Sequence, residues 1–268
     1  MNTIYEPKGK AREYSPLALN IYDGCDHQCD YCYVRNFKSD YYNTSGEREI
    51  MPRKNIIQEL LKDASKYSNK SQVLLCFTGD PYCHADVKYQ TTRKVLKILL
   101  DNNVLVSILT KGGSRAKRDI DIIKKFKNKI KFGSTLTFFD EKLSLKYEPF
   151  AALPSDRFET LKFFHNNNVR TWVSLEPVIL EEETFRIIDE TYKYVDEYKV
   201  GLTNYYTLPK QIDWKNFAEK VVKKLRMLNK DFYVKEDLRK YLDDGFLSKK
   251  ESDMDYLTIK PEKEIKLF

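Results

Sequence analysis

Three cysteines, Cys25, Cys29 and Cys32, lie close together near the start of the chain. Three residues separate the first two and two residues separate the last two. A cubane iron–sulfur cluster takes four thiolates, one for each iron. Three neighbouring thiolates therefore hold three irons and leave the fourth open to a small molecule. The spacing predicts a cluster that takes part in chemistry rather than one that only stores an electron.

Two other uses of these thiols have to be weighed. A structural zinc ion usually takes four ligands in a closed tetrahedron. The fourth would have to come from His27, Cys76, Cys83 or His84, and none lies at a usual zinc-finger spacing. A disulfide framework does not suit five cysteines in 268 residues, because that number is small and odd. The iron–sulfur cluster is the preferred interpretation, and zinc is the alternative.

The elements that must position these cysteines alternate between strands and helices. Apolar runs typical of strands cover six ranges, namely Leu17–Tyr22, Gln72–Thr78, Val104–Thr110, Ile130–Thr137, Val169–Leu175 and Tyr198–Leu202. Helical patterns lie between them, one capped by Asn55, then Tyr89–Leu100, Arg118–Phe126, Ser155–His165 and Glu181–Tyr194, and one capped by Asp213. This order predicts an α/β fold with a parallel sheet curled into a partial (β/α)6 barrel. A flat, doubly wound sheet is the alternative.

Active sites in such folds lie at the carboxyl ends of the strands. The cysteine loop follows the first expected strand directly, so it falls on this edge. Polar or small residues also stand at the ends of the other strands: Thr78, Gly79 and Asp80 at the second, Lys111 at the third, Ser134 at the fourth and Glu176 at the fifth. We expect these residues to share one site with the cysteines.

The cysteine spacing, with Tyr31 just before the third cysteine, resembles the cluster motif of radical S-adenosylmethionine (SAM) enzymes. Further stretches resemble the branch of that superfamily that includes spore photoproduct lyase. They are residues 20–35, 78–82, 110–112, 134–137, Glu148-Pro149 followed by 154–157, 176–178 and 232–239, in that order. The resemblance covers residues 14–240 and supports the partial barrel.

The resemblance implies two cofactors, a 4Fe-4S cluster on Cys25, Cys29 and Cys32, and SAM bound to the open iron through its amino and carboxylate groups. An electron from the cluster then cleaves the sulfonium and releases a 5'-deoxyadenosyl radical. The cofactor carries the hard chemistry, and the protein supplies position and shielding. A reductant protein such as a flavodoxin or a ferredoxin is an implied partner.

Five residues are expected to hold SAM by position in the resemblance. Thr78, Gly79 and Asp80 match the stretch that meets its amino group, because glycine permits close approach and a carboxylate complements an ammonium. Lys111 could meet its carboxylate, and Ser134 could offer a hydroxyl to its ribose.

Aromatic and acidic residues are further candidates. Tyrosines that could stack on adenine or on a base are Tyr31, Tyr33, Tyr82, Tyr205 and Tyr206. Glu176 stands at the expected barrel mouth, where an acid could handle ribose, substrate or a proton.

Two further cysteines could serve the reaction. In spore photoproduct lyase, a cysteine just ahead of the matching second-strand motif returns a hydrogen atom to the product radical. Cys76 lies near that place, but the stretch here is one residue longer, and side chains alternate faces along a strand. Cys76 is therefore either the hydrogen donor or a small core residue turned away from the site. Cys83, on the following loop, is a rival donor.

The composition limits which class of protein this is and where in the cell it is expected. Hydrophobic residues make up 41% and aromatic residues 13% of the chain, which excludes a disordered protein. No apolar run approaches the roughly 18 residues of a membrane span, and the start lacks a signal-peptide core. We expect a cytoplasmic protein with no membrane partner. Its barrel domain should cover residues 1–240 and a polar extension residues 241–268.

The net charge of +7 is mildly basic. Lysine-rich stretches at residues 124–131 and 220–226 could attract the phosphates of DNA or RNA. The alternative is a solvated surface, because 40 acidic residues are interspersed with the basic ones.

Taken together, the residues and the resemblance predict a radical SAM enzyme. Its substrate would be a pyrimidine or lesion in DNA, repaired by spore photoproduct lyase-like chemistry, or a base undergoing modification. A peptide or a metabolite is the alternative substrate. A non-catalytic interaction protein that binds an iron–sulfur cluster or zinc is the alternative from another class.

Overall fold

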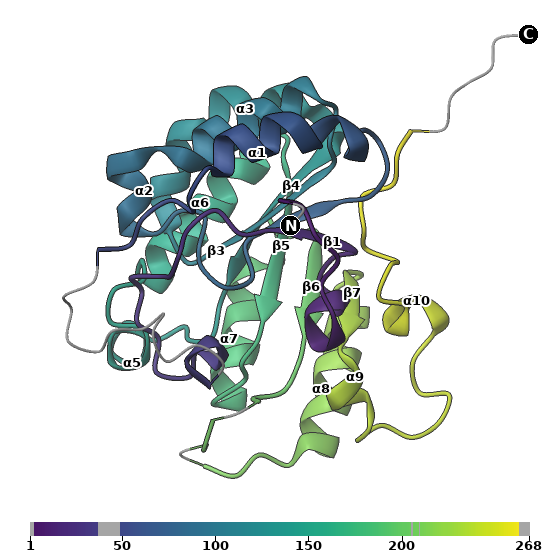
Figure 1. The fold of residues 1–268 in the computed structure, drawn as a ribbon. Coiled ribbons are helices and arrows are strands. Elements are labelled where there is room, and N and C mark those ends of the chain that lie inside the picture. The colour runs from purple at the N-terminus through teal and green to yellow at the C-terminus, as the bar shows by residue number, and fades with distance from the viewer. Residues whose placement is uncertain (1–2, 37–48, 205, 209, 263–268) are drawn as a thin grey trace, which may run out of the picture.

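The computed structural model describes residues 3–36, 49–204, 206–208 and 210–262. Seven parallel strands form one sheet, in which they are ordered as along the chain (Figure 1). The strands are β1 (Leu17–Leu19), β2 (Val73–Leu75), β3 (Val106–Thr110), β4 (Ile130–Thr135), β5 (Arg170–Leu175), β6 (Glu197–Val200) and β7 (Asp231–Val234). The sheet curls without closing, with β1 and β7 as its edges, which confirms the α/β partial barrel.

The sheet has one strand more than was predicted. β7 lies almost wholly within the stretch 232–239, which the sequence analysis used only for the family resemblance. Several predicted strands also end earlier than expected. β1 stops at Leu19 and β2 at Leu75, so residues 20–22 and 76–78 leave the ladder and become part of the loops around the site.

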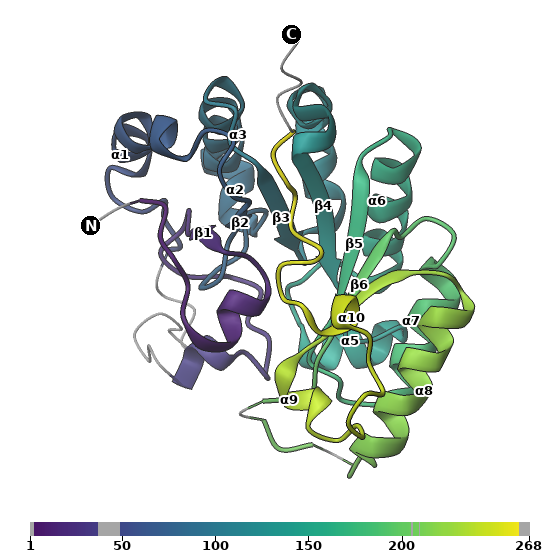
Figure 2. The same ribbon diagram turned by 90° about the vertical axis from the view of Figure 1, so that its right-hand side faces the viewer.

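Most helices cover the outer face of the sheet, whereas the short helix at residues 249–252 belongs to the tail on its open side (Figures 1 and 2). The helices are α1 (Ile56–Asp63), α2 (His84–Tyr89), α3 (Thr91–Asp101), α4 (Ile120–Ile123), α5 (Glu141–Tyr147), α6 (Pro154–Asn166), α7 (Glu181–Thr191), α8 (Trp214–Met227), α9 (Glu236–Arg239) and α10 (Lys249–Ser252). Their apolar residues pack against the strands, as Phe217, Val221 and Leu225 of α8 do. Within the described part of the chain, no helix is long and apolar enough to cross a membrane.

Local geometry confirms one predicted cap and corrects another. Asp213 caps α8, because its carboxylate accepts the backbone N–H of Asn216 at 3.1 Å. The prediction for Asn55 was wrong, because this residue is left-handed (φ 58°) and its side chain makes no capping bond to α1. The predicted helix over Tyr89–Leu100 is interrupted by Gln90, whose φ of 49° separates α2 from α3.

The amino half of the barrel interior is filled by polar side chains around a tryptophan. The Trp172 indole donates to the Ile108 carbonyl at 2.9 Å and lies against Gly133, where any side chain would collide with it. Lys131 and Glu197 form a buried ion pair beside this ring. Lys131 belongs to the lysine-rich stretch expected on the surface, and alternation along β4 turns it inward instead.

Segments from both ends of the chain cover the open side of the barrel (Figure 2). At the start, the buried Lys199 ammonium donates to the carbonyls of Glu13 and Tyr14 at 2.9 and 3.1 Å. Toward the end, the Leu257 carbonyl accepts from Lys131 at 2.6 Å, and Arg12 pairs with Asp255 at 2.8 Å. The described part of the polar tail therefore packs across the barrel. The domain boundary at residue 240 stays a prediction.

Candidate functional site

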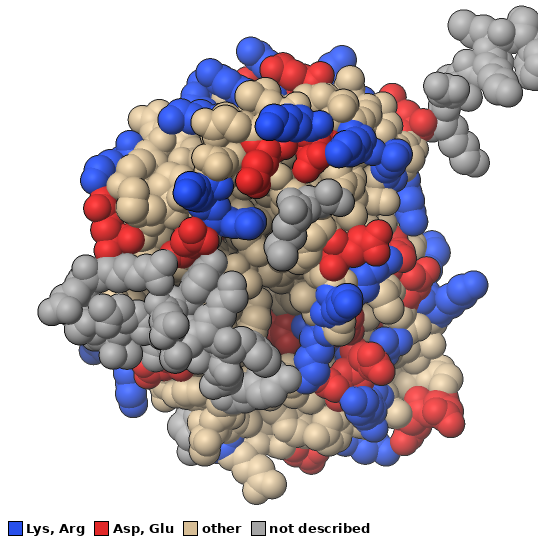
Figure 3. Space-filling view, in the orientation of Figure 1, with Lys and Arg blue, Asp and Glu red and all other residues tan. Residues whose placement is uncertain are grey.

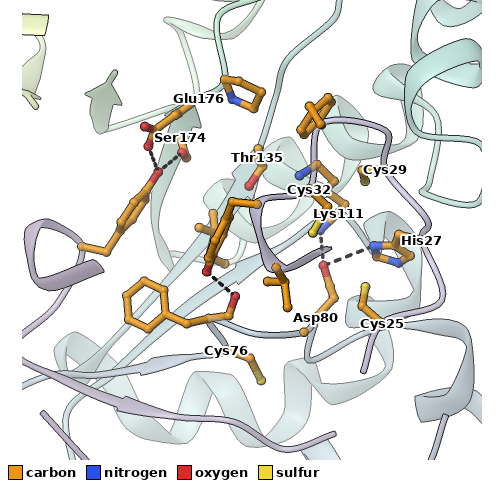
Figure 4. Close-up of a pocket in the computed structure, with 18 of the residues that line it drawn as sticks. Cys25, His27, Cys29, Cys32, Cys76, Asp80, Lys111, Thr135, Ser174 and Glu176 are labelled. Carbon is orange, nitrogen blue, oxygen red and sulfur yellow. Dashed lines mark hydrogen bonds and ion pairs between the residues drawn. The ribbon is translucent and has the colours of Figure 1, made fainter. Parts of the chain in front are cut away.

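A cavity of about 250 Å³ opens at the carboxyl ends of the strands (Figure 4). Its walls come from the cysteine loop, from the ends of β2, β3, β4 and β5, and from the segment before β1. Cys25, Cys29 and Cys32 all line it. The predicted position of the cysteine loop at this edge is therefore confirmed.

Side chains and backbone contacts hold the cysteine loop in place. The Asn20 carboxamide oxygen accepts the backbone N–H groups of Phe77 and Thr78 at 2.8 and 3.0 Å, which ties the end of β1 to the end of β2. The Asp26 carboxylate accepts the N–H groups of His84 and Ala85, both at 2.9 Å, at the start of α2. The loop is thus held both before and directly after Cys25.

None of the three thiols is in a disulfide, and the set suits a cluster. Cys29 is buried, and Cys25 and Cys32 are half-buried. Burial raises the pKa of Cys29 to about 12, while the charges of Lys111 and Arg157 lower it and that of Glu148 raises it. Among the described residues, no three His, Cys, Asp or Glu side chains gather tightly enough for a single metal ion. A four-iron cluster instead takes one thiolate per iron, and three cysteines spread along one cavity wall suit that donor set.

Asp80 is a buried carboxylate with protein partners on both oxygens. One oxygen accepts from the Thr110 hydroxyl at 2.5 Å and the Tyr82 N–H at 2.8 Å. The other accepts the Lys111 N–H at 2.7 Å and lies 3.6 Å from Nδ1 of His27. Asp80 therefore joins the ends of β2 and β3 to the cysteine loop. It also lines the cavity, where its charge is available to an ammonium group.

His27 stands inside the cysteine triplet but is already engaged. Its Nε2 lies 3.1 Å from the Arg115 guanidinium and its Nδ1 faces Asp80. Burial, helped by the charge of Arg115, holds the pKa of His27 well below its usual range. The imidazole is therefore neutral and serves to hold the loop.

A buried ionic cluster lies behind Cys29 and Cys32. Lys111 Nζ lies 4.0 Å from the Glu148 carboxylate and 5.3 Å from the centre of the Tyr31 ring. Glu148 also accepts from the Tyr31 hydroxyl and pairs with Arg157 at 2.5 Å. Burial alone would raise the pKa of Glu148, but Arg157 and Lys111 lower it overall, so this carboxylate is ionised.

A second polar group lies at the opposite wall of the cavity. Glu176 accepts from the Tyr14 hydroxyl at 2.5 Å and from the Lys235 ammonium at 2.6 Å. The Tyr14 hydroxyl also lies 2.9 Å from the Ser174 hydroxyl. All four residues line the cavity, and Figure 4 shows Glu176 and Ser174 converging on this hydroxyl.

The structure brings together most of the predicted site residues. Those that line the cavity are Cys25, Cys29, Tyr31, Cys32, Cys76, Gly79, Asp80, Lys111 and Glu176. Thr78, Cys83 and Ser134 are not among the lining residues. Ser134 donates instead to the Thr110 carbonyl at 2.9 Å, and its neighbour Thr135 lines the cavity, as alternation along β4 requires. Cys83 is fully buried in the core at the start of α2.

Cys76 occupies an intermediate position. It lines the cavity but is 6% exposed, and Figure 4 shows its sulfur at the edge of the group, beyond Asp80. Burial raises the pKa of this thiol, so it keeps its proton and a hydrogen atom to give.

Sequence reasoning assigned no role to Tyr14, Lys235, Glu148 or Arg157. Lys235 follows β7, the strand that was missed, and Tyr14 lies on a segment ahead of the first strand. Glu148 and Arg157 stood in the stretches that carried the family resemblance, and that was the available signal. Of the tyrosines expected to stack, Tyr31 and Tyr33 line the cavity, and Tyr206 meets the Tyr31 ring edge-on at 6.4 Å between ring centres without lining it. Tyr82 is buried in the core, and Tyr205 lies outside the described residues.

Comparison with known proteins decides the family. The model of the Radical SAM superfamily matches residues 19–195, which is more than half of the chain and includes the cysteine loop and strands β2 to β5. The protein belongs to the radical SAM superfamily. Enzymes of this superfamily use a 4Fe-4S cluster and SAM, and the three cysteines that line one cavity fit that cluster.

Two uncharacterised proteins are similar in sequence to this radical SAM protein. MJ0683 of Methanocaldococcus jannaschii is 29% identical over 69% of the chain and 70% of its own length. ORF301 of Acidianus two-tailed virus is 28% identical over 66% of the chain and 60% of its own length.

Solved radical SAM structures share the fold. SuiB of Streptococcus suis, bound to SAM, matches with a TM-score of 0.63 at 19% identity, over 87% of this chain and 53% of SuiB. A variant of spore photoproduct lyase with bound SAM and dinucleoside spore photoproduct also matches with 0.63, at 14% identity, over 86% of this chain and 78% of the lyase. The chain spans about half the length of SuiB. At these identities the likeness concerns the fold.

Proposed function

We propose that this radical SAM protein acts on a base in nucleic acid, most simply a pyrimidine lesion in DNA repaired as in spore photoproduct lyase. The cofactors, when bound, supply a 5'-deoxyadenosyl radical that takes a hydrogen atom from the substrate. The observation that carries the proposal is one cavity lined by three cysteines outside any disulfide, by Asp80 and Lys111, and by aromatic side chains.

Different residues of this cavity would bind the cluster and SAM. Cys25, Cys29 and Cys32 would hold the cluster. Gly79 leaves room for close approach, and Asp80 offers a carboxylate to the amino group of SAM. The Lys111 ammonium, 16% exposed, offers a charge to its carboxylate.

Aromatic rings support a base as the substrate. Tyr14, Tyr31, Tyr33 and Phe77 line the cavity, and Phe77 meets Tyr14 edge-on at 5.9 Å between ring centres. Flipped or single-stranded bases are usually held by stacking on such rings. Cys76, protonated and at the cavity edge, is suited to return a hydrogen atom to the product.

The surface charges give the proposal weaker support. Lys220, Lys223 and Lys224, expected as a phosphate-binding stretch, each pair with an acid, namely Glu181, Glu219 and Asp189. Figure 3 shows acidic and basic side chains interspersed on one face of the molecule. Nucleic acid would therefore be recognised mainly through the aromatic side chains of the cavity, because Lys10 and Lys235 in its lining are also paired, with Asp237 and with Glu176. A cytoplasmic location and a flavodoxin or ferredoxin as electron donor complete the proposal.

Substrate-stimulated cleavage of SAM tests this proposal. The reconstituted protein would be given DNA that carries spore photoproduct, undamaged DNA, RNA or no addition, and the repaired base and 5'-deoxyadenosine would be measured. We expect damaged DNA to raise both products. If no nucleic acid raises either product or is retained by the protein at low salt, the nucleic-acid substrate is wrong. A peptide or metabolite would then be the substrate class to search.

A further inference from the structure

The strongest feature that the proposed function does not use is the ion pair of Glu148 and Arg157. Both side chains are fully buried, and Arg157 Nη2 lies 2.5 Å from Glu148 Oε2. Removing two charges from water is costly, and well-packed apolar residues often serve stability as well or better. We therefore look for a role of this buried ion pair other than stabilising the fold.

All three guanidinium nitrogens of Arg157 have partners that hold the side chain in place. Its Nε donates to the Ala152 carbonyl at 2.7 Å, and its Nη1 donates to the Thr135 carbonyl at 3.1 Å. Thr135 ends β4 and lines the cavity. A lysine has the same charge but cannot reach three acceptors in this planar arrangement. The positive charge is therefore held at one place relative to the cavity wall.

Glu148 connects Arg157 to two residues that line the cavity, Tyr31 and Lys111. Its Oε2 also accepts from the Ser144 hydroxyl at 3.1 Å. Its Oε1 accepts from the hydroxyl of Tyr31, the residue before Cys32, and lies 4.0 Å from the Lys111 ammonium. The Tyr31 hydroxyl has a second partner in Thr137 at 3.1 Å. The pair thus touches the cysteine loop on one side and the end of β3 on the other.

Three charges stand together at this wall, those of Arg157, Glu148 and Lys111. Arg157 and Glu148 cancel each other, so the group carries one net positive charge. They lie beside the cysteine loop, because Glu148 holds the hydroxyl of Tyr31, the residue before Cys32, and Lys111 lines the same cavity as the three cysteines. Negative charge on a cluster grows when it takes up an electron, so the same three charges must act on its reduction.

We propose that the buried Glu148–Arg157 pair sets the reduction potential of the cluster, by fixing the charge beside the cysteine loop and holding Tyr31 and Lys111 against it. The inference rests on the cluster common to the superfamily and not on the substrate proposed above. The two residues are positioning residues, because they act through Tyr31, Lys111 and the local field.

The test is a redox titration of the reconstituted protein without SAM, followed by electron paramagnetic resonance. Glu148→Gln keeps the size of the side chain and removes the negative charge, so we expect a higher midpoint potential. Arg157→Gln removes the positive charge, so we expect a lower one. The double variant restores the net charge and should return toward the wild-type value. Because no SAM is cleaved, a wrong substrate would not affect this result.

A second buried pair in the same chain provides the matched control. Lys131 and Glu197 are equally inaccessible, but they lie in the amino half of the barrel, next to Trp172 and the Leu257 carbonyl. Glu197→Gln should leave the potential at the wild-type value. Arg157→Lys, which keeps the charge without the fork, should stay closer to wild type than Arg157→Gln.

Two results would overturn the inference. One is a Glu148→Gln protein whose potential equals that of the wild type or moves no further than that of Glu197→Gln. The other is a shift of both single variants in the same direction. If Arg157→Gln does not fold with its cluster, the comparison of Glu148→Gln with Glu197→Gln still decides.

Discussion

A Cβ atom on Gly79 would lie 2.7 Å from the carbonyl oxygen of Gly24. The loop after β2 therefore packs directly on the backbone that leads into Cys25. Real Cβ atoms do not approach an oxygen this closely, so a side chain at Gly79 would displace one of the two loops. The contact makes the position of the first cysteine depend on a residue more than fifty positions away in the sequence.

We predict that Gly79→Ala weakens cluster binding. Forcing a methyl group into this contact should destabilise the fold by about 1–3 kcal/mol and lower the iron bound after reconstitution. Gly9→Ala is the control, because an added Cβ there has no heavy atom within 4 Å, and its cost comes only from the positive φ (57°) of Gly9, which Gly79 does not share. Iron and sulfide analysis checks the prediction, which fails if both variants bind as much iron as the wild type.

Lys111 should bind the carboxylate of SAM. Loss of a charge-assisted hydrogen bond worth about 1.5–3 kcal/mol predicts that Lys111→Met weakens SAM binding by about 10- to 100-fold. Lys117→Met is the control, because its ammonium lies over the Phe163 ring, away from the cavity lining. Equilibrium binding to the reconstituted protein measures the effect. Equal affinities in the two variants would remove Lys111 from the binding site.

Lys199 makes stability depend on pH. Burial, together with the charge of Lys131, lowers the pKa of Lys199 to about 7, whereas a lysine in the unfolded chain has a pKa near 10.4. Between these values the unfolded state binds the extra proton, so stability should rise with pH through this window. Below the folded-state pKa, the ammonium is charged in both states, and the full cost of burying it destabilises the folded protein.

Lys199→Met removes this dependence. The free energy of unfolding of the variant, measured by denaturant titration between pH 7 and 10, should rise less with pH than that of the wild type. Lys62→Met, at an exposed position on α1, is the control. The same slope in the wild type and in Lys199→Met would show that the ammonium is not desolvated.

The two buried thiols outside the cysteine triplet should behave differently. Cys76 lines the cavity, whereas Cys83 is fully buried away from it. With a substrate in hand, Cys76→Ala should divert the product radical to side products, and Cys83→Ala should leave the product profile unchanged. Chromatography of the products distinguishes the two. A normal profile from Cys76→Ala would count against repair by a thiol hydrogen donor.

Much of the site could be predicted because it lies at strand ends. A cysteine loop, a Gly-Asp stretch, Lys111 and Glu176 each follow a strand, and parallel strands bring their carboxyl ends to one edge. The spacing of the cysteines was enough to predict the superfamily without knowledge of the fold. Side-chain direction was harder: Ser134 and Thr135 are neighbours, and one residue decides which of them faces the cavity.

The remaining residues could not be predicted because tertiary contacts select them. Tyr14 reaches Glu176 from a segment before the first strand, and Lys235 reaches it from the end of β7, the strand that was missed. In the sequence, Lys131 resembles the neighbouring surface lysines, but in the structure it is buried against Glu197. No local pattern distinguishes these residues from ordinary polar ones.

The most direct test of the account is cleavage of SAM. The wild type, Cys29→Ala and Cys83→Ala proteins would be reconstituted anaerobically with iron and sulfide, given dithionite and SAM, and assayed for 5'-deoxyadenosine. We expect the product from the wild type and from Cys83→Ala, and none from Cys29→Ala. Its absence from a wild-type protein that holds a four-iron cluster, or equal amounts from Cys29→Ala, would contradict the central claim.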